Sequence, residues 1–282
     1  MKKSLFCLCL TLCLLLCLVG CSANEEPPKL ALRFLDVGQG DSALLSTPEH
    51  HILIDAGPEY SQERLCQRLE QLGVQKLSLA IFSHPDEDHI GGADGVISTI
   101  PTEEIWLNGA PMENESAKRL MDAAKQQGCT VRTVKAGDGI SLGNLAISVL
   151  YPLSMDGDIE SNSGSIMLRV SCEQFCAVFT GDAGAKEEEL LISRYGKTQL
   201  DCDIYKSAHH GSNTSGSEAF LSVMTPRYAV VSCGKENTYG HPHGGELSLM
   251  EQSGATVLRT DLDGEIVFVT DGTSIRYLEG EY

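Results

Sequence analysis

The stretch that decides the fold is Ser83-His84-Pro85-Asp86-Glu87-Asp88-His89-Ile90-Gly91-Gly92. It follows residues 77–82, a nearly continuous apolar run that is typical of a strand covered on both faces. A loop at a strand end frees its side chains from strand alternation, so these histidines and carboxylates can converge on one point. Imidazole and carboxylate are ligands for zinc, manganese and iron. The stretch therefore indicates a metal site, although a solvated acidic turn with two incidental histidines would contain the same residues.

Three further clusters follow strand-like runs later in the chain. Phe179-Thr180-Gly181-Asp182 ends an apolar run, and an aspartate beside a glycine can bridge two cations. Lys206-Ser207-Ala208-His209-His210-Gly211-Ser212 follows Ile204-Tyr205, and Asn237-Thr238-Tyr239-Gly240-His241-Pro242 is the last cluster. Each cluster alone is also typical of an ordinary turn. Their joint occurrence, each beside a strand end, favours one shared metal centre.

Strand-like runs and helical spacing alternate through the rest of the chain. Residues 61–72 and 114–127 have apolar residues at helical spacing, and each segment ends at a glycine. We expect further helices at 185–193, 217–224 and 245–252. We expect further strands at 30–35, 43–45, 52–54, 131–134, near Ile140, and at 145–150, 166–170, 177–180, 228–232, 256–259 and 266–270. Because strands and helices interleave and each half contains β-meanders, the sequence predicts one α/β sandwich domain over residues 30–282.

The N-terminal segment has a different composition. Met1-Lys2-Lys3 is basic, and residues 4–19 carry no charge and end at Leu18-Val19-Gly20-Cys21. This pattern predicts an export signal over residues 1–20, with an uncleaved membrane anchor as the alternative. Leu-Val-Gly-Cys resembles the bacterial lipobox, in which the cysteine is lipid-modified and begins the mature protein. We therefore expect a lipid on Cys21, a flexible tether over residues 21–29, and an extracytoplasmic domain held at the cell membrane.

Composition narrows the class of protein. The apolar fraction of 42% and the charged fraction of 21% are those of a globular chain. A formal charge of −18 argues against a protein that coats long nucleic acids, because affinity for phosphate backbones comes from Lys and Arg. Five of the 11 cysteines lie in the first 21 residues. The other six form no C-x-x-C pair, so no thiolate zinc site is expected, and disulfide pairing cannot be deduced.

Two more segments complete a resemblance, Leu35-Asp36-Val37-Gly38-Gln39-Gly40-Asp41-Ser42 and Ile54-Asp55-Ala56-Gly57. Together with the four clusters they resemble the metallo-β-lactamase superfamily, and more narrowly the hydrolase domain of ComEC-type competence proteins and its free-standing relatives. The resemblance implies an αββα sandwich with a metal site at one edge. It implies a buried structural aspartate, Asp55, behind a set of metal ligands: His84, Asp86, Asp88, His89, Asp182 and His209.

The chain departs from the usual superfamily pattern at two places. Asp86 stands where the superfamily motif has its second histidine, a change typical of the ComEC-like branch. No histidine lies between His89 and His209, where the superfamily supplies a further ligand, and the corresponding stretch is Asn162-Ser163-Gly164-Ser165. The site is therefore rich in carboxylate. We expect one or two divalent ions, with Mn²⁺ favoured by ligand type and Zn²⁺ also open.

Other residues have supporting or catalytic roles in this hypothesis. The resemblance makes Asp88 the residue that orients the attacking water. His241 and Lys206 are candidates to hold a phosphate oxygen or to protonate the leaving group, and a plain surface position for His241 is equally open. Supporting or structural roles are expected for the remaining candidates, Asp36, Gln39, Asp41, His210 and Asn237, although turn chemistry alone explains the first three equally well.

The sequence thus predicts an exported, lipid-anchored, metal-dependent hydrolase that uses metal-activated water. A phosphodiesterase or nuclease type is expected, acting on a nucleotide-like small phosphodiester or on short DNA. In one alternative the fold is the same, but the enzyme hydrolyses a lactone, a thioester or a β-lactam instead of a phosphodiester. The other is a surface binding module with a degenerate, non-catalytic site. No protein partner can be deduced.

Overall fold

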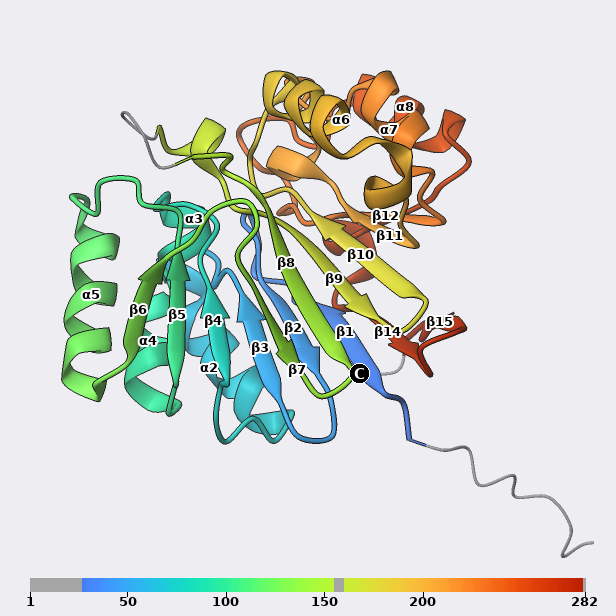
Figure 1. Cartoon of the computed structure of the whole chain (residues 1–282). Helices are drawn as coiled ribbons and strands as arrows, with labels where there is room; N and C mark the ends of the chain where they lie inside the picture. Colours follow the sequence, from blue (N-terminus) through green and yellow to red (C-terminus); the bar gives the residue numbers. More distant parts are fainter. Residues whose placement is uncertain (1–26, 155–159, 281–282) are drawn as a thin grey trace, which may run out of the picture.

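The computed structural model describes residues 27–154 and 160–280. The predicted signal segment, Cys21 and most of the predicted tether lie outside these residues. Two β-sheets pack face to face, and helices cover the outer face of each (Figure 1). The predicted αββα sandwich in a single domain is confirmed.

The first sheet has the strand order β15-β14-β1-β2-β3-β4-β5-β6. Its strands are β1 (Leu30–Phe34), β2 (Ala43–Ser46), β3 (His51–Ile54), β4 (Leu79–Ile81), β5 (Glu104–Leu107), β6 (Thr130–Thr133), β14 (Ile266–Thr270) and β15 (Ile275–Tyr277). The second sheet has the order β13-β12-β11-β10-β9-β8-β7. Its strands are β7 (Gly139–Leu142), β8 (Leu145–Tyr151), β9 (Met167–Cys172), β10 (Phe175–Phe179), β11 (Ile204–Lys206), β12 (Tyr228–Val231) and β13 (Thr256–Arg259).

The helices belong to two groups, one on each sheet. Those of the first half are η1 (Glu59–Ser61), α2 (Gln62–Gln71), α3 (Glu87–Ile90), α4 (Ala93–Thr99) and α5 (Glu115–Gln127). Those of the second half are η2 (Asn162–Gly164), α6 (Ala185–Leu200), η3 (Ala208–Gly211), α7 (Glu218–Met224), α8 (Gly244–Gln252) and α9 (Thr260–Asp263).

Three apolar layers hold these elements together. The central layer lies between the sheets and contains Phe34, Trp106, Phe179 and Phe268. A second layer joins the first sheet to α2, α4 and α5, and a third joins the second sheet to α6, α7 and α8. The central strands of each sheet are thus covered on both faces, which explains why β4 and β10 are buried along their whole length, whereas the edge strand β6 is exposed.

The topology brings the predicted motifs to one edge of the sandwich. β3, β4, β5 and β6 pair in parallel, as do β10, β11, β12 and β13. The carboxyl ends of parallel strands meet at the same edge of a sheet. Asp55, Ser83 and His84 follow β3 and β4 there, and Asp182 and His209 follow β10 and β11.

Some elements lie where no strand or helix was expected. α4 and β5 fill the interval between the first metal-site motif and α5, and α9 and β15 flank β14. α6 extends beyond the expected helix to Leu200, across a non-helical Gly196. The six cysteines after Cys21 are free thiols, and Cys172, Cys176, Cys202 and Cys233 are buried in the apolar layers.

Across residues 27–154 and 160–280, no helix combines the length and the apolar character needed to cross a membrane.

Candidate metal centre

The loop after β4 supplies four of the predicted ligands. His84 is buried directly behind the strand end, and Asp86 precedes the short helix α3. The carbonyl of Asp86 accepts hydrogen bonds from the N–H groups of His89 and Ile90. This turn places Asp88 and His89 beside His84, whose ring centroid lies 4.1 Å from that of His89.

Asp55 orients His89 from behind. Its Oδ2 lies 2.9 Å from His89 Nδ1, and its carboxylate accepts hydrogen bonds from the Ser83 N–H and hydroxyl at 2.7 and 2.8 Å. Asp55 itself has a left-handed φ of 57°. A carboxylate at Nδ1 fixes the tautomer that leaves Nε2 free for a metal. Asp55 is 2% exposed and is therefore buried, as the resemblance implied.

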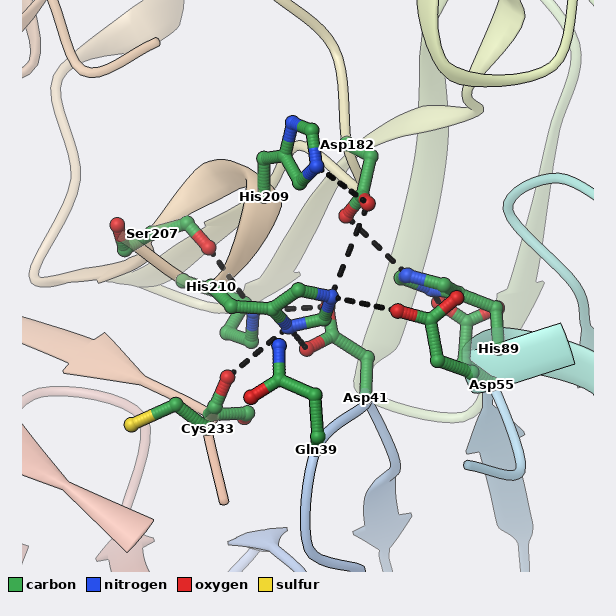
Figure 2. Close-up of polar contacts among 12 residues, drawn as sticks. Gln39, Asp41, Asp55, His89, Asp182, Ser207, His209, His210 and Cys233 are labelled. Carbon is green, nitrogen blue, oxygen red and sulfur yellow. Dashed lines mark hydrogen bonds and ion pairs between the residues drawn. The ribbon is translucent and has the colours of Figure 1, made fainter. Parts of the chain in front are cut away.

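Asp182 lies at the centre of the site, and the rings of His89, His209 and His210 point toward it (Figure 2). Its Oδ1 is 3.2 Å from His89 Nε2, and its Oδ2 is 3.6 Å from His209 Nε2 and 3.7 Å from His210 Nε2. Gly181, with a φ of 52°, turns the chain so closely past Ser83 and Ser165 that a Cβ there would clash with Ser165. Burial alone would raise the pKa of Asp182, but the charges of His89 and His210 hold that pKa well below its ordinary value.

His210, for which a supporting role was expected, lies inside the ligand cluster. Its Nε2 is 3.1 Å from Asp88 Oδ2, while its Nδ1 is 3.0 Å from the Ser232 carbonyl oxygen and 3.2 Å from Asp41 Oδ1. Burial lowers the pKa of His210, but the carboxylates of Asp182, Asp41 and Asp88 outweigh burial and raise it to about 10. Each of Asp88, His89, Asp182 and His210 offers one ligand atom, and these atoms all lie within 4.8 Å of one another.

The donor set fits a divalent cation. His84 Nε2, His89 Nε2 and Asp182 Oδ1 are buried and have no partner in hydrogen-bonding geometry among the described residues. Buried polar atoms are normally paired, and a divalent ion is a partner that imidazole nitrogen and carboxylate oxygen atoms would accept here. A second set, Asp41, Asp55 and His89, is equally compact, but the Lys206 ammonium group already supplies a positive charge there.

Lys206 lies behind the site rather than at its mouth. Its Nζ is 2.8 Å from Asp41 Oδ2 and donates a hydrogen bond to the Ser207 carbonyl oxygen, and the residue is 3% exposed. This position does not favour the predicted contact between Lys206 and a substrate phosphate. The ammonium group instead neutralises Asp41, whose pKa burial would raise but Lys206 and His210 hold well below its ordinary value.

The loop after β12 forms the rim of the site. The Asn237 side chain accepts a hydrogen bond from the His241 N–H and donates to the carbonyl oxygens of Gly234 and His241. The His241 ring lies 5.6 Å from that of His209 and stacks on Tyr239. Burial, together with the neighbouring His210, His209 and His243, lowers the pKa of His241 to about 4.

The turn after β1 carries three candidate site residues, and the structure places them differently. Asp41 reaches the ligand cluster, as described above. Gln39 accepts a hydrogen bond from the Gly234 N–H and so ties this turn to the rim loop. Asp36 caps its own turn by accepting from the Gly38 N–H, and its side chain is 43% exposed. Asp36 is thus not brought into the ligand cluster.

Several contributors were not predicted. Ser165 Oγ lies 3.3 Å from His84 Nδ1 and accepts a hydrogen bond from the Asp182 N–H at 3.1 Å, and the Ser161 hydroxyl donates a hydrogen bond to Asp86 Oδ1. The stretch that lacks the superfamily histidine therefore holds other ligands in place. Two tyrosines near the rim, Tyr60 and Tyr239, are 71% and 66% exposed. In the sequence, these residues could have been recognised only as serines that lie between two ligand motifs and as a tyrosine two positions before His241.

A buried pair of carboxyl groups lies behind the loop that carries His209 and His210. Glu188 of α6 accepts hydrogen bonds from the N–H groups of Gly216 and Ser217 at 2.5 and 2.9 Å. Glu246 of α8 packs against Gly216, and its Oε1 has no hydrogen-bond partner among the described residues. Burial and the charge of Glu188 raise the pKa of Glu246 to about 8.

Glu246→Gln is expected to stabilise the fold at alkaline pH. The folded state keeps the Glu246 proton up to about pH 8, whereas the unfolded chain releases it near an ordinary pKa of about 4.3. The native protein therefore loses stability as pH rises between these values, and the glutamine variant should not. Thermal denaturation at pH 5 and pH 8 should show the variant several degrees above the natural protein at pH 8 alone. An equal offset at both pH values would contradict this.

Comparisons with known proteins agree with the fold and identify the family. The model of the metallo-β-lactamase superfamily matches residues 35–124. ComE operon protein 3 of Bacillus subtilis is 28% identical over 93% of this chain and 35% of its own length. Competence protein ComA of Neisseria gonorrhoeae is 34% identical over 84% of this chain and 32% of its own length. The chain thus spans about a third of the length of the curated relatives it matches.

Among solved structures, the metallo-β-lactamase fold protein YhfI of Bacillus subtilis has a TM-score of 0.56 at 10% identity, over 88% of this chain and all of that one. CmlA, a diiron β-hydroxylase from Streptomyces venezuelae, has a TM-score of 0.56 at 13% identity, over 90% of this chain and 55% of that one. At such identities the likeness shows the fold alone.

The sandwich, the ligand-bearing loops at its edge and the matching superfamily model define a metallo-β-lactamase-fold protein. Within that superfamily, the chain belongs to the ComEC-like branch that its competence-protein homologues support. The fold, the candidate metal site and these homologues together support a metal-dependent hydrolase that binds divalent metal.

Proposed function

We propose that this chain is a metal-dependent phosphodiesterase that acts on a small, nucleotide-like substrate. The observation that carries the proposal is the compact cluster of Asp88, His89, Asp182 and His210. A bound divalent cation would supply Lewis-acid stabilisation of the charge on a phosphoryl oxygen and would activate water near neutral pH.

The chain's own residues orient the reactants in this proposal. Asp88 is held by His210, yet its side chain is 29% exposed, so it faces both the cluster and solvent. That position suits a carboxylate that accepts a hydrogen bond from the attacking water. His241 on the rim suits a hydrogen bond to a phosphate oxygen. With a pKa of about 4 its ring is neutral at pH 7, which favours this role over protonation of the leaving group.

The charge and the rim support a small substrate over a long polymer. A formal charge of −18 repels an extended phosphate backbone. The exposed ring of Tyr239, stacked on His241, offers a face on which a base can stack beside the cluster. A nucleotide or short oligonucleotide needs little more contact than this.

Export and lipid anchoring at Cys21 are part of the proposal. The described chain enters the fold at β1, which runs from Leu30 toward the turn that carries Asp41 (Figure 1). A tether that joins at Leu30 therefore reaches the end of β1 away from the metal centre. In this arrangement the mouth of the site would point away from an anchoring membrane and toward extracytoplasmic substrates.

The test is an assay of the protein without residues 1–21, stripped of metal and then supplied with Mn²⁺ or Zn²⁺. We expect metal-dependent cleavage of bis-p-nitrophenyl phosphate that falls about 100-fold or more in an Asp88→Ala variant. Hydrolysis of nitrocefin instead of bis-p-nitrophenyl phosphate would favour the alternative in which the enzyme hydrolyses a lactone, a thioester or a β-lactam. Neither bound metal nor turnover would favour the binding module. Equal cleavage by the variant would contradict the role given to Asp88.

A further inference from the structure

Two tyrosine rings leave most of their surface in water near the rim of the ligand cluster. Tyr60 in η1 is 71% exposed, and Tyr239 in the rim loop is 66% exposed. We propose that these rings are two base-stacking platforms on opposite sides of the cluster, so that the preferred substrate is a dinucleotide whose bridging phosphate lies between them. The inference rests on the proposed function and names its substrate class.

Tyr60 is exposed but held in place. Its hydroxyl oxygen accepts a hydrogen bond from the Gln39 N–H at 2.9 Å. Its ring packs against Gly38, where φ is 82° and a Cβ would lie 2.5 Å from the Tyr60 hydroxyl oxygen. The side chain of Gln39 lies beside His210 (Figure 2). A ring that is fixed before binding loses little conformational entropy when a base stacks on it, so Tyr60 is suited to be a platform.

The contacts of η1 place Tyr60 beside the loop that carries Asp88. The Glu59 N–H donates a hydrogen bond to Glu87 Oε1 in α3 at 2.8 Å. The two segments approach so closely that a Cβ on Gly91, at the end of α3, would lie 2.3 Å from the Glu59 nitrogen. Tyr60 therefore borders the cluster on the side of Asp88.

Tyr239 borders the cluster on the side of the second sheet. Its ring stacks on His241, with the ring centroids 5.6 Å apart and the ring planes at 20°. The His241 ring lies 5.6 Å from that of His209, whose Nε2 faces Asp182. Tyr60 follows β3 of the first sheet, whereas Tyr239 follows β12 of the second. The ligand cluster thus lies between the two rings.

Two platforms fit the charge of this chain. Proteins that bind long single strands combine stacking rings with a basic groove along the backbone, and a formal charge of −18 disfavours such a groove. A dinucleotide has a single bridging phosphate, whose charge the proposed cation would balance. The rest of its binding can come from its two bases, because every base has a face that stacks on an aromatic ring.

The experiment measures binding without cleavage. The probes are a dithymidine methylphosphonate, in which an uncharged methylphosphonate replaces the bridging phosphate, and the matching mononucleoside methyl methylphosphonate. NMR titration of the protein gives both dissociation constants. We expect the dinucleoside probe to bind at least about 10-fold more tightly than the mononucleoside probe. Since neither probe has to be cleaved, this result is independent of the assay with bis-p-nitrophenyl phosphate, and the two proposals can fail separately.

The variants test whether the ring of Tyr60 is responsible. Tyr60→Ala should weaken binding of the dinucleoside probe about 10-fold, close to that of the mononucleoside probe. Tyr60→Phe keeps the ring and should retain most of the affinity. Leu190→Ala, at a 39% exposed apolar position of α6, is the matched control and should bind as the unsubstituted protein does. If Tyr60→Ala fails to fold by circular dichroism, Tyr60→Leu replaces it.

Three results would overturn the inference. The first is no measurable binding of the dinucleoside probe, and the second is equal affinity for the two probes. The third is an equal loss in Tyr60→Phe and Tyr60→Ala, because the effect would then come from the hydrogen bond between the Tyr60 hydroxyl and Gln39 and not from stacking.

Discussion

Asp182→Asn is expected to lower kcat/KM by at least about 1,000-fold, or about 4 kcal/mol of transition-state stabilisation. Asp182 is the residue that His84, His89, His209 and His210 all face. An asparagine keeps the shape of the side chain but removes its negative charge. Cation binding should therefore weaken together with catalysis, because the variant removes the carboxylate that all four histidines face.

Three measurements separate this result from simple misfolding. Metal content should fall in the variant, and added Mn²⁺ should no longer raise its melting temperature as it does for the natural protein. Circular dichroism of the metal-free variant should be unchanged. Asp36→Asn is the matched control, since Asp36 caps an exposed turn close to the site but outside the ligand cluster. If Asp182→Asn kept the metal content and the activity of the unsubstituted protein, the assignment of this residue as the central ligand would be wrong.

The sandwich was predictable because long apolar runs and helical spacing mark most of its elements, but α4 and β5 show where this reasoning fails. The α4 sequence includes Gly95 and β-branched residues, which disfavour an isolated helix. Val96 and Ile97 nevertheless pack into the layer under α2 and α5, and a Cβ at Gly95 would require the Gln62 side chain to move. β5 is buried at its last three residues, so its four residues show no alternation of apolar and polar side chains. Both α4 and β5 therefore form because of tertiary packing, which the local sequence does not show.

The ligand cluster was predictable as a set of loops but not in its internal assignment. Neighbouring histidines carry no periodicity, so the sequence alone cannot tell that both His209 and His210 face Asp182. That depends on two left-handed backbone conformations and on contacts to Asp41 and the Ser232 carbonyl oxygen, which come from other strands. Long-range pairing of this kind leaves no mark in the local sequence.

The position of Lys206 could have been derived from strand periodicity. Side chains two residues apart on a strand share a face. Ile204 belongs to the layer between the sheets and Tyr205 to the outer layer, so Lys206 points between the sheets with Ile204. A lysine there needs a counter-ion, because a buried charge is otherwise very costly. Asp41 supplies it from the turn after β1.

Lys206→Met is therefore expected to destabilise the fold by about 3–5 kcal/mol, because it leaves the Asp41 carboxylate buried beside one less cation. Methionine is close to lysine in volume, so the change removes the charge with little loss of packing. Asp41 Oδ2 lies 2.8 Å from Nζ, and the two side chains are 7% and 4% exposed. The melting temperature of the metal-free protein should fall by about 10 °C.

The double variant Asp41→Asn, Lys206→Met tests this account, since removing both charges should recover part of the lost stability. A lysine that contacts a substrate phosphate would behave differently: Lys206→Met would then raise KM for bis-p-nitrophenyl phosphate and leave the melting temperature unchanged. Arg64→Met is a suitable control, because its side chain is 58% exposed and lies 4.0 Å from Asp36 in a surface pair. Pairs of that kind contribute about 1 kcal/mol or less, so the control should melt close to the natural protein. An unchanged melting temperature in Lys206→Met would contradict the structural role given to this residue and return it to the candidate substrate contacts.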